Sequence, residues 1–190
     1  MTAVVEVLRI GQRPVRDDRI TTHAALVSRA FGASRIYMTE ANPEIRGAIQ
    51  AVNRTWGGRF EVTYVDRWQP VLHEKKRKGH VVVNLTMYGE PINEMQEKLR
   101  LHMEGSGSRD ILVIIGAEKV PRSVYEAADY NVSAGGQPHS EIAALAVLLD
   151  RIYGGRQFET EFAGARRRII PSRRGKAVES AHGEDGLPGT

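Results

Sequence analysis

A glycine-rich turn carrying four polar side chains stands directly before the most apolar stretch of the chain. Its residues, 135–141, read GGQPHSE, and an aliphatic run follows at once. Ser140 suits the N-cap of a helix that begins here, because its hydroxyl can accept a hydrogen bond from an amide of the first turn. Glu141 suits that first turn, where the helix dipole favours a negative charge. Capping leaves Gln137 and His139 unexplained, which makes them candidates for binding a ligand.

Two earlier turns have the same character. Residues 84–91 read NLTMYGEP, and residues 116–121 read GAEKVP. Glycine lets the backbone approach a ligand closely, and proline fixes the loop. Ordinary turn chemistry accounts for any one of the three segments alone. Their occurrence together favours a shared binding site.

The ligand that these turns suit is a neutral heteroaromatic group, because they offer mainly backbone amides and carbonyls and few convergent charges. The phosphate-loop pattern GxxxxGK[ST] is absent from GAEKVP, and no GxGxxG follows the first expected strand, so ATP and NAD are poor candidates. Metal binding is a weaker alternative, since only His139 and Glu141 are close in sequence and no third ligand is evident. The chain has no cysteine, which excludes thiol catalysis, disulfides and cysteine zinc sites.

Basic residues are clustered, although the net charge is only +4. One cluster is KKRK, which comprises Lys75, Lys76, Arg77 and Lys78. The other comprises Arg166, Arg167, Arg168, Arg173, Arg174 and Lys176. Such clusters attract the phosphate backbone of nucleic acids, so a nucleic acid is a candidate partner. A solvated face plus a basic tail is the alternative explanation.

The segments that must position these residues alternate between strands and helices. Strands are expected at residues 3–10, 35–39, 60–65, 80–89, 110–121 and 128–136. Helices are expected at 21–33, 42–58, from 67 to 78, at 92–103 and after residue 140. Unbroken apolar runs such as 81–85 indicate burial on both faces of a sheet. The predicted fold class is therefore α/β, a mostly parallel sheet flanked by helices, which binds ligands at the carboxyl ends of its strands.

The 190 residues predict one domain, 1–171, followed by a basic tail, 172–190, that we expect to be disordered because its composition lacks apolar periodicity. No apolar window is long enough for a membrane span and no signal pattern is present, so we expect a soluble, cytoplasmic protein with no membrane partner. The helix after residue 140 is apolar nearly all round. A homodimer is therefore expected, because such a helix is buried either in the core or between subunits.

Four stretches resemble the archaeal tRNA (cytidine-56)-2′-O-ribose methyltransferase family, of the SPOUT class. They are RPVRDDRITTHAALVSRAFGA, NLTMYGEP, VIIGAEKVPRSVYEAADYNV and GGQPHSEIAALAVLLDR. The resemblance runs from about residue 7 to residue 170, with the stretches in the expected order. It implies a C-terminal trefoil knot, S-adenosylmethionine bound in the knot and a homodimer. No metal is expected, because no third ligand accompanies His139 and Glu141.

The resemblance also implies a set of cofactor-binding residues, which fall in the three turns described above. They are Leu85, then Gly116, Ala117, Glu118, Lys119 and Val120, then Ala134, Gly135, Gly136, Gln137, Pro138, His139, Ser140 and Glu141.

The implied reaction moves a methyl group to the ribose 2′-hydroxyl of cytidine 56 in the tRNA T-loop. Related enzymes carry an arginine just before an AFG helix end, and here Leu26 stands near that place. The nearest substitutes are Arg19, which could orient the hydroxyl or hold a phosphate, and His23, which could act as a base. Arg16 is better explained as an RNA phosphate contact.

RNA binding is assigned to Arg16 and to the two clusters, through Lys75, Lys76, Arg77, Lys78, Arg166, Arg167 and Arg168. Two alternatives stay open: a SPOUT methyltransferase for another RNA site, and a non-catalytic RNA-binding dimer. The intact glycine turns count against the second, since a pure binder does not need them.

Overall fold

The computed structural model describes residues 3–11, 18–40, 42–104 and 107–180. At its centre is a six-stranded sheet in the order β3-β2-β1-β5-β4-β6, and every pair of neighbouring strands is parallel. The strands are β1 (Val5–Ile10), β2 (Arg35–Met38), β3 (Glu61–Tyr64), β4 (Val81–Pro91), β5 (Ile111–Gly116) and β6 (Tyr130–Ser133). The predicted α/β class with a parallel sheet is confirmed.

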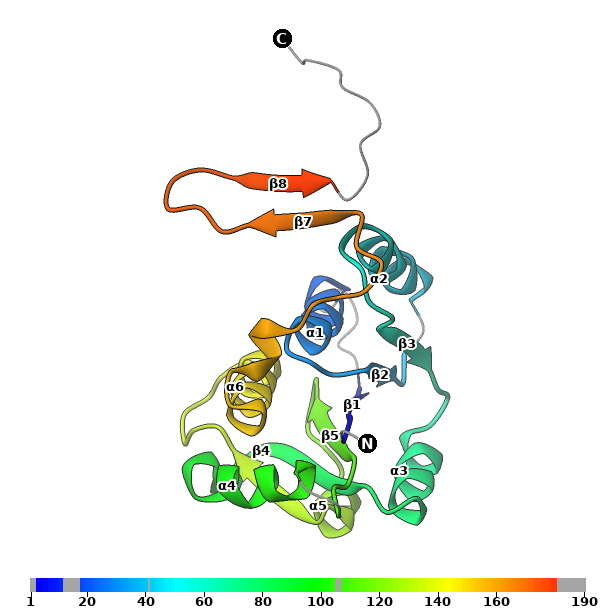
Figure 1. Ribbon diagram of the computed structural model, residues 1–190. Coiled ribbons are helices and arrows are strands. Elements are labelled where there is room, and N and C mark those ends of the chain that lie inside the picture. The colour runs from blue at the N-terminus through cyan, green and yellow to red at the C-terminus, as the bar shows by residue number, and fades with distance from the viewer. Residues whose placement is uncertain (1–2, 12–17, 41, 105–106, 181–190) are drawn as a thin grey trace.

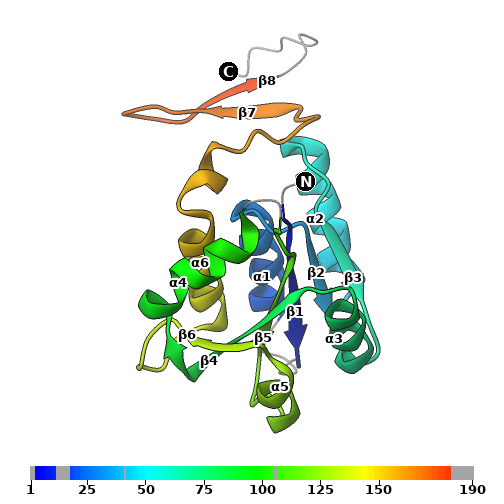
Figure 2. The same ribbon diagram turned by 60° about the horizontal axis from the view of Figure 1, so that its bottom comes forward.

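Helices cover both faces of the sheet, as Figure 1 and Figure 2 show. One face packs against α1 (Asp18–Ala30), α2 (Pro43–Trp56), α4 (Ile92–Met103) and α6 (Glu141–Tyr153). The other packs against α3 (Trp68–Arg77) and α5 (Arg122–Ala127). All six residues of β1 are buried, as burial on both faces requires.

Helix starts follow the capping rules read from the sequence. The Asn42 side chain accepts a hydrogen bond from the Glu44 N–H, and Pro43 occupies the first helical position. The Ser140 hydroxyl accepts from the Ile142 N–H at 3.2 Å, which confirms it as the N-cap of α6.

The structure differs from the sequence prediction around β4 and α5. β4 continues past Gly89 to Pro91, and both Leu85 and Glu90 pair with Val132 of β6 across a bulge. Gly89 allows this, because a Cβ there would lie 2.5 Å from the Asn131 backbone. Helix α5 was not expected, since its six residues are too few to show a clear apolar periodicity.

The C-terminal segment also differs from the expectation of disorder. Residues 177–180 form β8 (Ala177–Ser180), which pairs antiparallel with β7 (Arg167–Ile170) in a separate hairpin. All eight strand residues are exposed, so the hairpin lacks the buried apolar face by which strands are recognised in a sequence. Residues 181–190 of the predicted tail lie outside the described residues.

Helix α6 buries its apolar stripe within its own chain, against α1 and α4. Ala143 and Val147 are exposed on its outer side. Burial in the core accounts for most of its apolar character, and the homodimer stays a prediction. Within the described ranges, none of the helices has the length and apolarity required to cross a membrane.

Candidate cofactor pocket and RNA surface

A cavity of about 490 Å³ opens at the carboxyl edge of the sheet, where β4, β5 and β6 end. Its lining comes from all three turns selected in the sequence and from two helices. The lining residues are Leu85, Thr86, Met87, Tyr88, Gly116, Ala117, Glu118, Lys119, Val120, Tyr125, Ala134, His139, Glu141 and Ala144. The prediction that the three turns converge on one site is therefore confirmed by the geometry.

The turn after β5 is held tightly against the end of β1. The Ala117 N–H donates to the Ile10 carbonyl at 3.0 Å. A Cβ on Gly116 would lie 2.3 Å from Val120 Cγ2 and 2.9 Å from the Glu118 carbonyl oxygen. Glycine is therefore required here, because any side chain would force the turn open.

The turn after β6 is organised differently. The Ser133 hydroxyl donates to the Gly135 carbonyl at 2.9 Å and lies 3.2 Å from the Gly135 N–H. A Cβ on Gly135 or Gly136 would meet no heavy atom within 4 Å. Protein packing thus gives no reason for this glycine pair, whereas a ligand lying against the backbone would.

Charged groups of both signs line the cavity. Glu118 and Glu141 contribute carboxylates, and Lys119 contributes an ammonium group. Glu141 accepts a hydrogen bond from the guanidinium of the buried Arg9 at 3.5 Å. His139 Nδ1 lies 3.2 Å from the Ser140 carbonyl oxygen, to which it can donate a hydrogen bond.

Several cavity residues were not singled out in the sequence. The Thr86 and Tyr125 hydroxyls are hydrogen-bonded to each other at 2.9 Å across the cavity lining. Tyr125 lies on α5, a helix that the apolar pattern of the sequence does not predict. Thr86, Met87 and Tyr88 lie within the segment 84–91 already selected in the sequence, but no sequence feature marked these three residues as ligand-binding.

The predicted cofactor residues divide into two groups. Those that line the cavity are Leu85, Gly116, Ala117, Glu118, Lys119, Val120, Ala134, His139 and Glu141. Those that belong to the same segment but are not among the lining residues are Gly135, Gly136, Gln137, Pro138 and Ser140.

The proposed hydroxyl-activating residues lie on α1, and His23 is not among the residues that line the cavity. His23 is exposed on the second turn of that helix. Arg19 lies on its first turn, and Arg16 lies outside the described residues. Gly11, which directly follows β1, nevertheless lies near the cavity, since a Cβ on it would lie 4.0 Å from Glu118.

The structure contradicts the RNA-binding prediction for Lys75. Its side chain is buried and is ion-paired with Glu6 of β1, because helical periodicity turns it towards the sheet. Lys76 pairs with Asp129 at 3.3 Å, and Lys78 pairs with Glu74, yet both stay at the surface with Arg77.

The second basic cluster lies on the hairpin. Arg166, Arg167 and Arg168 are exposed, and Arg168 is ion-paired with Glu161. For metal binding, the described ranges contain no group of three or more histidine, cysteine, aspartate or glutamate side chains that could hold an ion.

Solved structures with similar architecture define the class. A TrmH/SpoU tRNA modifying enzyme from A. aeolicus has a TM-score of 0.55 at 15% identity, over 84% of this chain and 80% of that one. A probable methyltransferase from Bordetella pertussis Tohama I has a TM-score of 0.59 at 15% identity, over 81% and 94%. This protein thus has the SPOUT fold of the SpoU/TrmH methyltransferases.

The family follows from sequence similarity. Residues 56–179 match the family described as tRNA ribose 2′-O-methyltransferase, aTrm56. A tRNA (cytidine(56)-2′-O)-methyltransferase from Nitrosopumilus maritimus (strain SCM1) is 58% identical over 93% of this chain and 96% of its own length. That from Methanocaldococcus jannaschii is 50% identical over 92% and 96%. The chain belongs to this family, which confirms the predicted family; the trefoil knot stays a prediction.

Proposed function

We propose that this protein transfers the methyl group of S-adenosylmethionine to the ribose 2′-hydroxyl of cytidine 56 in tRNA. The observation that carries the proposal is the convergence of the three turns on one cavity in a chain that is 58% identical to an enzyme of that name. The structure of AviRb, a SpoU methyltransferase from Streptomyces viridochromogenes with AdoMet bound, supports the choice of cofactor: its TM-score is 0.55 at 14% identity, over 82% of this chain and 58% of that one.

The cavity suits S-adenosylmethionine in size and chemistry. A volume of about 490 Å³ falls in the range of small-molecule sites. Leu85, Val120 and Ala134 offer apolar walls to an adenine ring. The open space at the Gly135–Gly136 pair lets a ligand lie against the main chain.

Charge complementarity points the same way. When bound, S-adenosylmethionine supplies an activated methyl group on a positively charged sulfur. The Glu118 and Glu141 carboxylates line the cavity and suit a cationic ligand. Arg9 holds Glu141 by its hydrogen bond, so that carboxylate keeps its position at the start of α6.

The ribose hydroxyl must be oriented and must lose its proton. We assign orientation to Arg19 and proton removal to His23, because α1 begins at the same carboxyl edge of the sheet as the cavity. β1, which precedes α1, is separated from β4 by one strand, a distance of about 10 Å between strand axes.

Two further features belong to the proposal. A homodimer would cover the exposed small and apolar side chains of α6, Ala143 and Val147. A tRNA substrate places the enzyme in the cytoplasm.

The test is methyl transfer to a defined position. The protein is incubated with labelled S-adenosylmethionine and an unmodified tRNA transcript, and the label is mapped to single nucleotides. Label on the ribose of cytidine 56 is expected, and a transcript with 2′-deoxycytidine at that position should take up none. Label on another nucleotide or on a base would assign a different RNA methylation. Absence of cofactor binding would leave a non-catalytic RNA-binding protein.

A further inference from the structure

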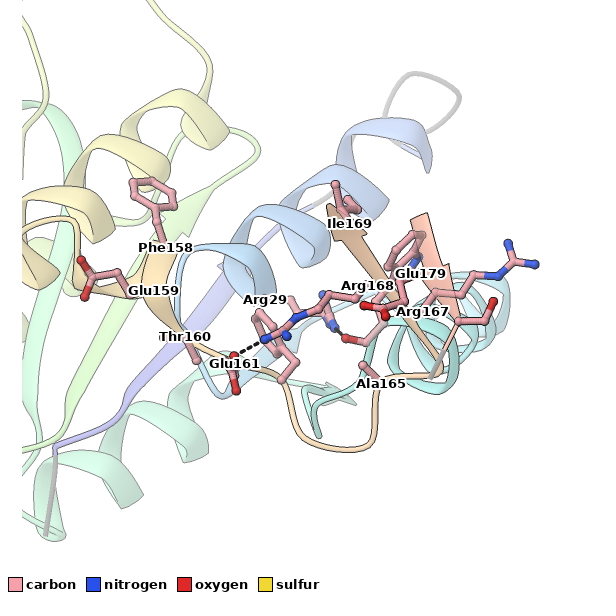
Figure 3. A pocket seen from close by; sticks show the side chains of 13 residues that line it. Arg29, Phe158, Glu159, Thr160, Glu161, Ala165, Arg167, Arg168, Ile169 and Glu179 are labelled. Carbon is pink, nitrogen blue, oxygen red and sulfur yellow. Dashed lines mark hydrogen bonds and ion pairs between the residues drawn. The ribbon is translucent and has the colours of Figure 1, made fainter. Parts of the chain in front are cut away.

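The β7–β8 hairpin stands away from the globular body. A groove of about 1020 Å³ lies between them. Figure 3 shows its side chains, with Phe158 and Arg29 on the body side and Arg167, Arg168 and Ile169 on the strand. A two-stranded hairpin alone is marginally stable in water. An exposed hairpin held off the core therefore calls for a role other than packing.

Its base is anchored to the body through the backbone. The Arg166 N–H donates to the Thr55 carbonyl at 3.0 Å, and the Gly58 N–H donates to the Ala163 carbonyl at 2.8 Å. The ion pair between Arg168 and Glu161 adds a side-chain contact. The hairpin is thus attached to the body at the start of β7.

The turn at the other end has a defined conformation and is strongly basic. The Ser172 hydroxyl donates to the Arg174 carbonyl at 2.9 Å and lies 3.3 Å from the Arg174 N–H, while Gly175 takes a φ of 102°. This turn presents Arg173, Arg174 and Lys176, all exposed. Within the described part of the chain none of the three forms an ion pair.

Charge along the hairpin is one-sided. Residues 166–180 contain five arginines and one lysine against the single acid Glu179. Guanidinium groups bind phosphate through paired hydrogen bonds, and such contacts are independent of base sequence. The chemistry therefore fits a nucleic acid backbone better than a protein surface.

The hairpin lies at the amino ends of the sheet strands, and the cofactor pocket lies at their carboxyl ends. Arg29 and Trp56, which line the hairpin groove, stand at the C-terminal ends of α1 and α2. These helices lead into β2 and β3, so the groove lies at the end of the sheet where strands begin. The pocket lies where the strands end. A six-residue strand spans about 20 Å, so this hairpin does not reach a nucleotide held at the pocket of its own chain.

We propose that the β7–β8 hairpin is an arm whose basic turn, Arg173, Arg174 and Lys176, binds the phosphate backbone of the substrate RNA far from the methylated nucleotide. The proposal rests on the proposed function, which supplies the RNA. The arm contributes affinity and the salt dependence of binding, and it takes no part in methyl transfer.

The test compares two triple variants of equal charge. One is R173Q/R174Q/K176Q; the control is R46Q/K98Q/R109Q, which removes three exposed cations from the body. Binding of a full tRNA transcript and of an isolated T-arm hairpin is measured against salt concentration. Cofactor affinity, turnover at saturating tRNA and sedimentation are measured in parallel.

For the hairpin variant we expect tRNA affinity to fall about tenfold and the log–log salt slope to decrease by about 2, as loss of three phosphate contacts requires. The T-arm affinity, cofactor affinity, turnover and oligomeric state should match the wild type, and the control should change tRNA affinity by less than about twofold.

Three outcomes would overturn the inference. An unchanged tRNA affinity and salt slope would show that the turn does not touch RNA. Equal losses on tRNA and on the T-arm would place the contact near the methylated nucleotide. A change in sedimentation would instead assign the hairpin, with its exposed Ile169 and Val178, to a contact between protein chains. If the wild-type protein bound tRNA with a salt dependence that the hairpin variant reduces, but methylated no nucleotide, the proposed function would be refuted and the RNA-binding role of the hairpin would stand.

Discussion

The guanidinium of Arg9 lies 3.5 Å from the carboxylate of Glu141, and the Arg9 side chain is only 2% exposed. Arg9 stands near the carboxyl end of β1, and Glu141 is the first residue of α6 and a member of the pocket lining. Arg9 also donates to the Gly11 carbonyl at 3.2 Å. A buried charge in the centre of the sheet thus links Gly11, which follows β1, to Glu141 at the end of the third pocket turn.

Replacing Arg9 with methionine should weaken cofactor binding about tenfold. The change removes a charge-assisted hydrogen bond of about 1.5 kcal/mol that positions Glu141. Calorimetric titration with S-adenosylmethionine measures the loss, and circular dichroism checks that the fold is retained. The matched control is Arg151→Met, which replaces an exposed arginine on α6, the helix that Glu141 begins. Wild-type cofactor affinity in a folded Arg9→Met protein would show that Glu141 needs no such support.

Replacing His23 with alanine should lower turnover about a hundredfold, the usual contribution of a general base. Cofactor affinity should hold, because His23 lies outside the pocket lining. Single-turnover methylation at saturating tRNA, measured against cofactor concentration, gives the rate of methyl transfer separately from the cofactor affinity. His73→Ala, which removes an exposed histidine from α3, serves as the control. Equal rates for the two variants would transfer the role of base to another group.

Replacing Lys75 with methionine should destabilise the fold without changing the affinity for tRNA. The buried Glu6 carboxylate would lose its ion pair, at a cost of roughly 3 kcal/mol. Denaturant unfolding measures that loss, and the double variant Glu6→Gln, Lys75→Met should regain part of it. Lys78→Met, at the exposed end of the same cluster, should barely change stability. Weaker tRNA binding by a folded Lys75→Met protein would restore Lys75 to the RNA surface.

The thermal stability should fall as the pH drops from 7 to 5. Burial, aided by Lys75, holds the pKa of His80 below its usual value of 6.5. The unfolded chain therefore binds a proton on His80 before the folded chain does, and stability that is complete above pH 6.5 is lost as the pH falls.

His80→Gln should flatten this pH dependence, whereas His73→Gln, at an exposed position, should leave it intact. Some dependence will remain, because burial also lowers the pKa of His102. Calorimetric melting across the pH range provides the measurement. If the plots of melting temperature against pH were parallel for wild type and His80→Gln, His80 would bind its proton as readily in the folded chain as in the unfolded chain.

Local rules predicted much of the fold. The apolar runs that became β4 and β5, and the caps at Asn42 and Ser140, depend on near neighbours in the chain. Helix α5 and the exposed strand β8 carry no such periodic signal, so the sequence did not predict them.

The site was predictable only in part. That three turns could bind a ligand followed from their glycines, prolines and place after strands. Lys75 was misassigned because charge in a sequence says nothing of which helix face turns inward. Tyr125 was missed for the related reason that its approach to Thr86 spans 39 residues of chain.

The sequence by itself determined the strands of the central sheet, its longer helices, the family and the chemistry that the turns can offer, because those depend on residue type and short-range spacing. Only the tertiary structure decided that Arg9 would hold Glu141, that Lys75 would be buried, and that a basic hairpin would stand at the edge opposite the pocket. Contacts between residues far apart in the chain arise when the sheet is assembled, and no local rule specifies them.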